Sequence, residues 1–206
     1  MTSETRTSST GAALVISSLR PALILFVLLS VITGLAYPFL VTGIVRYIFP
    51  YQADGSLLTD AQGNPVGSAL IGQQFSEPGH FWGRPSATTP MPYNAAASSG
   101  SNLGPSNPAL AALVRQRAEA LRAADPGNNA PIPVDLVTAS ASGLDPQISR
   151  AAADYQIPRI ARVRGLPEEK LRALVESFTE KPLFGIIGEA RVNVLELNLA
   201  LDQAGR

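Results

Sequence analysis

The longest apolar run of the chain lies near its amino end. From Pro21 to Val45 the sequence carries no charged residue, and Arg20 and Arg46 bracket the run. As an α-helix it would be roughly 37 Å long, against about 30 Å for the hydrocarbon core of a bilayer. A cleaved signal peptide would have a shorter apolar core, and VRYIFPY is a poor cleavage site. The pattern therefore predicts that residues 21–46 form a single retained transmembrane helix.

The basic residues around this run predict its orientation. Arg6 and Arg20 precede the helix, whereas only Arg46 follows it closely, before acidic residues. Basic flanks tend to stay on the cytoplasmic side. We therefore expect residues 1–20 to be a short cytoplasmic tail and residues 47–206 to be an extracytoplasmic domain, in a protein of the inner (plasma) membrane.

One face of the predicted helix is unusual for a surface that meets lipid. Small and polar residues recur there at helical spacing and a proline follows: Ser30, Thr33, Gly34, Tyr37 and Pro38. Small residues let another helix approach closely, and Pro38 leaves the Gly34 carbonyl without its usual partner. A tolerated kink in a lone anchor is one interpretation. We favour packing against a larger membrane protein within the lipid bilayer.

Beyond the helix, short apolar runs separated by turn residues indicate an α+β domain. Residues 56–59 read as a strand, and after a Gly/Asn/Pro-rich turn residues 69–75 are expected to return as a second strand. Residues 81–108 are rich in Pro, Gly, Ser and Asn and should be irregular. Large side chains are embedded in them: Phe81, Trp82, Arg84 and Tyr93. A flexible linker rarely needs such residues, so we expect an ordered loop that contacts something.

Helices dominate the rest of the pattern. Asn107 and Pro108 are typical of a helix N-cap and first position, and an apolar stripe follows them. Residues 132–138 read as a strand. The closing segment, 191–203, is expected to be a helix capped by Asn193, with a strand as the alternative.

Three further helix starts are expected between these elements. Asp145 and Pro146 read as an N-cap and first helical residue, so a helix should begin there. A second short helix is expected from Pro158. A third is expected near Pro167, where two glutamates in the first turn suit the helix dipole.

Composition narrows the possible chemistry. The 206 residues contain 16 Lys+Arg and 16 Asp+Glu, no cysteine and the single histidine His80. Balanced charge does not recruit nucleic acid, and a chain without cysteine forms no disulfide and has no thiol nucleophile. His80 lies in a Pro/Gly-rich stretch without a nucleophile-elbow pattern. We therefore expect no catalytic residue, no metal site and no tightly bound cofactor.

The segment VTASASGLDPQIS, residues 137–149, has the composition of a ligand-binding loop. A strand–loop–helix turn presents backbone N–H groups to an anion, so Ser142, Gly143 and Asp145 are candidate nucleotide contacts. The segment is nevertheless no P-loop: it has no lysine, and the carboxylate of Asp145 would repel an anion. The favoured alternative is a capped helix start.

Two other functions compete with nucleotide binding. A membrane-anchored helix-turn-helix regulator would place Arg159, Arg162 and Arg164 on a second helix, but Tyr-Gln-Ile-Pro would stand where such a turn normally contains Gly. The expected extracytoplasmic location also argues against DNA. An accessory subunit, with one packing helix and a domain without a catalytic constellation, fits the pattern best.

Several segments together identify a resemblance. They are TGLAYPFLVTGI at 33–44, GSLL at 55–58, VGSALIGQQF at 66–75, FWGRPSA at 81–87, YNAAASSGSNLGPSNP at 93–108, DLVTASASGLDPQIS at 135–149 and VNVLELNLAL at 192–201. In this order they resemble the C subunit of the Kdp potassium-transporting P-type ATPase, over nearly all of the chain.

This resemblance implies a fold, partners and a role. The family has one N-terminal membrane helix and an extracytoplasmic α/β domain. It assembles with a channel-like potassium-binding subunit, an ATP-hydrolysing P-type subunit and a very small membrane peptide. The resemblance implies a non-catalytic accessory subunit of an ATP-driven, high-affinity potassium uptake complex, described for the family as a catalytic chaperone that raises the affinity of the ATPase subunit for ATP.

ATP contact with this subunit is proposed for the family, and the resemblance places Gly143, Asp145 and Gln147 in its most recognisable loop. Gln147, where a histidine is half expected, is the residue to tie to nucleotide. A domain outside the cell membrane cannot reach cytoplasmic ATP, however. We therefore favour roles in assembly and in the potassium pathway over direct ATP binding.

Overall fold

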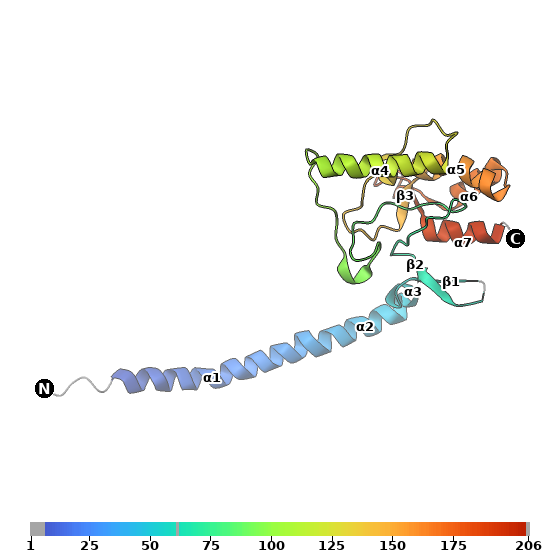
Figure 1. Ribbon diagram of the computed structural model, residues 1–206. Coiled ribbons are helices and arrows are strands. Elements are labelled where there is room, and N and C mark those ends of the chain that lie inside the picture. The colour runs from blue at the N-terminus through green and yellow to red at the C-terminus, as the bar shows by residue number, and fades with distance from the viewer. Residues whose placement is uncertain (1–6, 61, 205–206) are drawn as a thin grey trace. The chain divides into compact units, whose positions relative to one another are not determined.

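The computed structural model describes residues 7–60 and 62–204, with side chains from residue 17 onward (Figure 1). The chain divides into two compact units, the first ending at Asp54 and the second beginning at Gly55. This division matches one N-terminal membrane helix followed by an α+β domain. Residues 1–6 of the expected cytoplasmic tail, including Arg6, lie outside the described residues.

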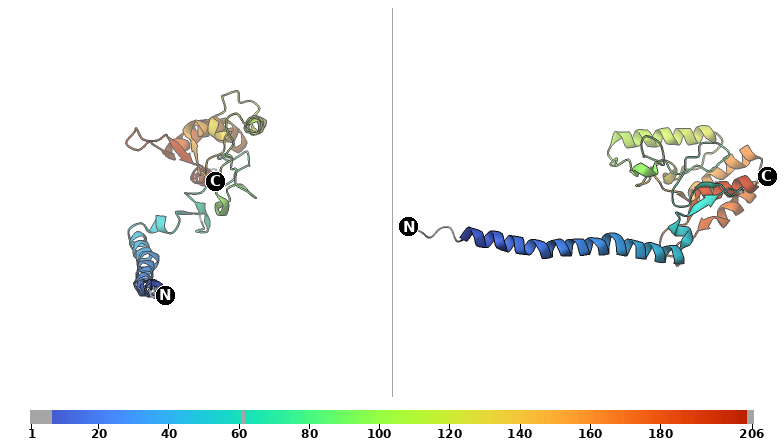
Figure 2. Two further views of the ribbon diagram at one scale, coloured as in Figure 1. Left: turned by 90° about the vertical axis from the view of Figure 1, so that its left-hand side faces the viewer. Right: turned by 90° about the horizontal axis from the view of Figure 1, so that it is seen from below.

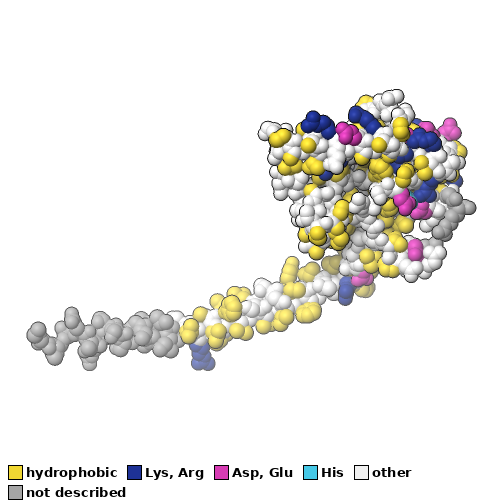
Figure 3. Space-filling model, viewed as in Figure 1, with side chains coloured by type: hydrophobic (Ala, Val, Ile, Leu, Met, Phe, Trp, Pro, Cys, Tyr) yellow, Lys and Arg dark blue, Asp and Glu magenta, His cyan; other side chains and the backbone are white. Residues whose placement is uncertain are grey.

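The first unit is one long apolar helix followed by a short turn of helix. It consists of α1 (Thr7–Val31), the π-helical turn η1 (Ile32–Ala36), α2 (Tyr37–Ile48) and α3 (Pro50–Ala53). Figure 2 shows α1 and α2 running on without a break, and Figure 3 shows hydrophobic side chains along their described part, from residue 17 onward. The stretch Ser17–Ile48 has a mean hydropathy of 2.4 in its most apolar window and is long enough to cross a membrane.

A π-helical turn accommodates Pro38. Tyr37 donates its backbone N–H to the Ile32 carbonyl, five residues back, instead of the usual four. The Thr33 hydroxyl donates to the Leu29 carbonyl at 2.7 Å. Proline lacks an N–H and its ring crowds the carbonyl four residues earlier, so a wider turn before it relieves the conflict. The proline therefore modifies the helix without ending it.

In its described residues, 55–60 and 62–204, the second unit contains two small antiparallel sheets and four α-helices. Strands β1 (Leu57–Thr59) and β2 (Pro65–Ser68) form a hairpin. Strands β3 (Gln147–Ser149), β5 (Arg191–Asn193) and β4 (Thr179–Glu180) form the second sheet, in that order. The helices are α4 (Pro108–Ala124), α5 (Arg150–Arg164), α6 (Glu168–Ser177) and α7 (Val194–Ala204), and short 3-10 turns lie at η2 (Ala95–Ala97) and η3 (Val134–Leu136).

Two predicted helix caps are confirmed. The Asn107 side chain accepts a hydrogen bond from the Ala109 N–H at 2.9 Å, with Pro108 as the first helical residue. The Asn193 side chain accepts from the N–H groups of Leu195 and Glu196 at 3.1 and 3.2 Å. The closing segment contains both of the predicted alternatives, because the short strand β5 is followed at once by helix α7.

The first hairpin returns earlier than predicted. Asp60 accepts hydrogen bonds from the N–H groups of Gln62 at 2.9 Å and Asn64 at 2.8 Å. This local turn brings Pro65 opposite Thr59, and the pairing of β2 with β1 ends at Ser68, which lies opposite Leu57. The returning strand is therefore 65–68, and the predicted strand at 69–75 is wrong. A side chain that bonds the backbone two residues ahead is an efficient turn former.

The strand predicted at 132–138 is also wrong. The segment is irregular and contains only the 3-10 turn η3, with Val134 70% exposed. Pro131 and Pro133 lack the N–H groups that a strand would need for pairing. Apolar residues alone therefore misled the prediction.

Two further predictions, both about helix α5, are wrong. Asp145 is not its N-cap, since residues 147–149 form β3 and the Ser149 hydroxyl caps the helix by accepting the Ala152 N–H at 3.0 Å. No second helix begins at Pro158, which lies inside the continuous helix α5. Ile157 and Ile160 on either side of it are fully buried, and this burial outweighs one missing backbone hydrogen bond.

The core is formed where α5, α6 and α7 pack around the second sheet. Its large apolar side chains that are fully buried come from the sheet, from the three helices and, in one case, from the irregular loop. They are Phe81, Ile148, Ile157, Ile160, Leu171, Val175, Val192, Leu197 and Leu201. Phe81 is 0% exposed although it belongs to no regular element. The loop that carries it is therefore part of the core.

Candidate functional site

Two side-chain amides fix the loop that carries Phe81 and Trp82. Asn198 of α7 accepts the Phe81 N–H at 2.8 Å and donates to the Phe81 carbonyl at 2.9 Å. Gln156 of α5 does the same for Trp82, accepting its N–H at 2.8 Å and donating to its carbonyl at 3.1 Å. Each amide satisfies both backbone groups of one residue, as a neighbouring strand would. The predicted ordered loop is confirmed.

A buried arginine completes this support. Arg159 donates to the His80 carbonyl at 3.0 Å and to the Gln156 side chain at 2.7 Å, and also to the Pro78 carbonyl. Its guanidinium lies 4.4 Å from the centre of the Trp82 ring. Burial lowers the pKa of Arg159 to about 10, so the group stays charged at neutral pH. Gln156 and Asn198 were not predicted from the sequence, where their signal is a polar residue that interrupts an apolar helix stripe.

The structure contradicts the helix-turn-helix alternative. The expected turn lies inside α5, and the other two arginines of this region also have partners in the domain. Arg162 bonds the Asp125 carboxylate at 2.8 Å, and Arg164 bonds the Asp202 carboxylate at 2.6 Å. These cations hold the fold together and do not form a surface for DNA.

The 139–149 loop uses its own polar groups to hold its shape. Ser140 accepts the Gly143 N–H at 2.9 Å, Ser142 accepts the Leu144 N–H at 3.1 Å, and Asp145 accepts the Gln147 N–H at 3.0 Å. The serine hydroxyls and the carboxylate that made this loop look like a site are thus engaged in local turns.

Gly143 locks this loop onto the 86–99 segment. Its φ is +67°, and a Cβ there would lie 2.6 Å from the Ser99 carbonyl oxygen. The Ser86 hydroxyl donates to the Gly143 carbonyl at 2.7 Å, and the Ser99 N–H donates to the Ser142 carbonyl at 3.0 Å. The position therefore requires both the backbone freedom and the small size of glycine.

Only two of the four predicted nucleotide residues line a common cleft. Asp145 and Gln147 face a cleft of about 640 Å³, whereas Ser142 and Gly143 are not among its lining residues. The cleft also contains Arg84 and Arg191. Nucleotide binding by the four residues stays a prediction, since the geometry brings together only half of the set.

Both arginines of this cleft are paired with carboxylates of the same chain. Arg84 donates to the Asp145 carboxylate at 3.1 Å. Arg191 donates to Glu180 at 2.8 Å, and the Gln147 amide reaches the same carboxylate at 3.4 Å. An incoming phosphate would therefore compete with carboxylates for both arginines.

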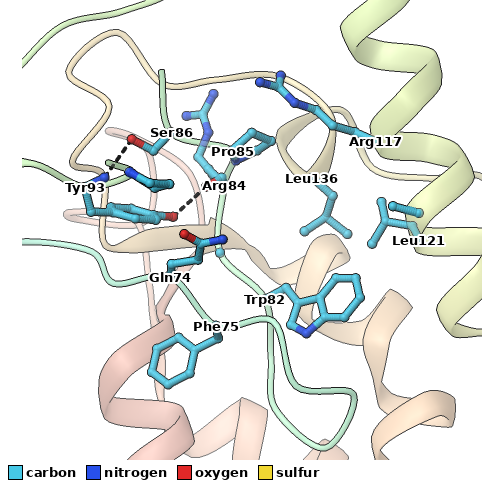
Figure 4. A pocket seen from close by; sticks show the side chains of 13 residues that line it. Gln74, Phe75, Trp82, Arg84, Pro85, Ser86, Tyr93, Arg117, Leu121 and Leu136 are labelled. Carbon is cyan, nitrogen blue, oxygen red and sulfur yellow. Dashed lines mark hydrogen bonds between the residues drawn. The ribbon is translucent and has the colours of Figure 1, made fainter. Parts of the chain in front are cut away.

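A second, smaller pocket lies beside Arg84 (Figure 4). Tyr93 donates its hydroxyl to the Arg84 carbonyl and its N–H to the Ser86 hydroxyl, the latter at 2.9 Å. Burial, reinforced by the nearby carboxylate of Asp145, raises the pKa of Tyr93 to about 12. The phenol is therefore neutral at physiological pH and remains a donor.

Among the described residues, one helix long and apolar enough to cross a membrane is followed by an α+β domain, and this architecture defines a membrane-anchored protein. The family described as "KdpC: K+-transporting ATPase, c chain" matches residues 19–203, and the chain belongs to this family. The predicted resemblance is confirmed.

Curated relatives cover most of the chain. A "Potassium-transporting ATPase KdpC subunit" of Variovorax paradoxus (strain S110) is 68% identical over 184 residues, which are 89% of this chain and 95% of the relative. Proteins of the same description are 68% identical in Polaromonas naphthalenivorans (strain CJ2), over 89% of this chain and 93% of the relative. In Sorangium cellulosum (strain So ce56) the identity is 58%, over 92% of this chain and 99% of the relative.

Proposed function

We propose that the chain is a non-catalytic accessory subunit of an ATP-driven, high-affinity potassium uptake complex. Its membership of the family and the description of its relatives as subunits of a potassium-transporting ATPase support this role. Its partners would be a channel-like potassium-binding subunit, an ATP-hydrolysing P-type subunit and a small membrane peptide. The complex would lie in the lipid bilayer, and the chain would not bind nucleic acid.

The observation that carries the proposal is an apolar hairpin tip between β4 and β5. The backbone pairs Leu183 with Ile187, and the left view of Figure 2 shows the loop (red) standing away from the domain. Phe184 is 84% and Ile186 83% exposed. Contiguous apolar side chains that a soluble surface would avoid are typical of an interface. A partner subunit would remove them from water.

The membrane helix offers a second surface for assembly. Apart from the neighbouring backbone of its own helix, a Cβ placed on Gly34 would meet no described atom within 4 Å, so a neighbouring helix has room to approach there. Ser30, Thr33, Tyr37 and Pro38 are the other members of this predicted packing face. Small residues on one face favour close contact between membrane helices.

An effect of this subunit on ATP affinity would be transmitted, not direct. In the orientation predicted from Arg20 and Arg46, the domain lies outside the membrane and cannot meet cytoplasmic ATP. A subunit that binds two states of a pump unequally changes the ligand affinity of the pump without touching the ligand. Ser142 and Asp145 accept hydrogen bonds from N–H groups of their own loop, and this supports a transmitted effect over direct contact with ATP. The catalytic chaperone function would then rest on coupling within the assembled complex.

The test is co-purification of the complex through a tag on this chain. We expect Phe184→Ser to reduce recovery of the ATPase subunits several-fold, whereas Val163→Ser, at an exposed apolar residue on α5, leaves recovery unchanged. Equal recovery with both variants would show that the hairpin is not part of the interface.

ATP hydrolysis tests the non-catalytic role. The chain alone should hydrolyse ATP no faster than buffer, and Gln147→Ala should change the KM of the complex for ATP by less than about twofold. A tenfold rise in that KM would restore direct nucleotide contact.

A further inference from the structure

The pocket beside Arg84 has one apolar side and one cationic side. It has a volume of about 290 Å³ and lies between the 74–93 loop and α4. Figure 4 shows Trp82, Leu121 and Leu136 gathered on one side, while the side chains of Arg84 and Arg117 extend toward Pro85 on the other. The two arginines come from segments that are distant in the sequence.

The positive charge of this pocket is not fully compensated. Both arginines line it and no aspartate or glutamate does. Arg84 bonds Asp145 through Nη1, but its Nε is buried and has no hydrogen-bond partner among the described residues. Arg117 donates to the Val137 carbonyl at 3.0 Å, and within residues 7–60 and 62–204 it has no carboxylate at salt-bridge distance.

Arg117 is also partly desolvated. Burial lowers the pKa of its guanidinium, and no carboxylate offsets this effect. The group nevertheless remains cationic at physiological pH, because the unperturbed value is far above 7. A half-buried guanidinium that has one hydrogen-bond acceptor among the described residues, beside a second guanidinium whose Nε is unsatisfied, favours an anion in the space between them.

We propose that this pocket binds a small organic carboxylate with an apolar, ring-sized body. The carboxylate would bridge the guanidinium groups of Arg84 and Arg117, whose planar donors match two carboxylate oxygens. The body would pack against Trp82, Leu121 and Leu136. A volume near the lower limit for ligand pockets, about 300 Å³, restricts the ligand to a small molecule. The site is built from this chain alone and does not depend on its role as a subunit.

The only tryptophan of the chain, Trp82, reports on this pocket directly. The full chain in detergent is titrated with para-nitrobenzoate, whose nitroaromatic ring quenches tryptophan fluorescence. We expect saturable quenching, and only weak linear quenching by the neutral isostere para-nitrobenzamide. The amide partitions into micelles at least as well as the anion, so it controls for non-specific contact.

Matched variants assign the binding to the arginine. Arg117→Gln should weaken para-nitrobenzoate binding about tenfold, the loss expected for one charge-assisted hydrogen bond. Arg115 lies on the exposed face of the same helix and, among the described residues, donates to the Ala111 carbonyl, so Arg115→Gln should bind as the unmodified chain does. Ala120→Phe adds a ring to the pocket wall without removing a hydrogen bond and should also abolish saturation. Circular dichroism confirms that each variant is folded.

Linear quenching by the carboxylate, or equal quenching by the carboxylate and the amide, would overturn the proposal. So would saturable binding that Arg117→Gln and Ala120→Phe both leave intact. Neither result would bear on co-purification of the complex, so the two proposals can fail independently.

Discussion

Asn198 on α7 and Phe81 in the irregular loop form a two-point hydrogen-bonded pair across 117 positions of sequence. The side-chain amide of Asn198 takes the place that a backbone strand would occupy beside Phe81. Both residues are buried, so water cannot replace these bonds. The pair explains how a Pro/Gly-rich segment enters the core without regular secondary structure.

Asn198→Ala should destabilise the domain by about 3 kcal/mol, because it leaves two buried backbone groups without partners. Urea unfolding of the full chain in detergent, followed by Trp82 fluorescence, measures the change. Asn129→Ala at an exposed position is the control and should change stability by less than about 0.5 kcal/mol. Equal midpoints for the two variants would mean that the pair contributes nothing.

Gly143→Ala should cost at least about 2 kcal/mol, since alanine is strained at positive φ and its Cβ would press on the Ser99 carbonyl. Gly104→Ala is the matched control, because a Cβ there would meet no atom within 4 Å. The same urea titration compares them. A stable Gly143→Ala protein would show that the two loops can separate without loss.

Gly34→Leu should disrupt assembly with the partner subunits, because a bulky side chain blocks close helix approach. Gly43→Leu is a stringent control: it adds the same side chain about half a turn around the helix. Recovery of the ATPase subunits after detergent extraction measures the effect. Loss of recovery with both variants, or with neither, would contradict a single packing face.

Tyr93 should make stability depend on alkaline pH. Its pKa in the folded protein is about 12, above the ordinary value of 10.0, so the unfolded chain loses the proton first. The stabilising contribution of the neutral phenol is therefore complete below pH about 10 and is lost as the pH rises to about 12. The stability difference between the unmodified chain and Tyr93→Phe, from urea midpoints, should shrink across this range. A pH-independent difference would show that the phenol titrates normally.

Cysteine labelling tests the orientation, because the chain has no cysteine of its own. Ser101→Cys should react with a membrane-impermeant maleimide in intact spheroplasts, as expected for an extracytoplasmic domain. Ser8→Cys, in the expected cytoplasmic tail, should react only after permeabilisation. The reverse pattern would place the domain beside cytoplasmic ATP and would revive nucleotide contact at Gln147.

Local signals accounted for the predictions that succeeded. The uncharged run that begins at Pro21 exceeds the thickness of a bilayer, so its length alone predicts a spanning helix. Asn107 and Asn193 each cap a helix through bonds to residues two or three positions ahead, which the sequence places within reach. Such interactions need no distant partner, and they were therefore readable before the fold was known.

The tertiary structure decided the features that depend on partners far away in the sequence. Residues 147–149 form a strand instead of a helix start because β5 pairs with them. Helix α5 continues through Pro158 because its neighbouring isoleucines are buried in the core. Arg84 and Arg117 meet at one pocket because the loop and α4 fold together. Burial and long-range pairing outweigh local preference at these positions, and neither can be read from residues that are adjacent in the chain.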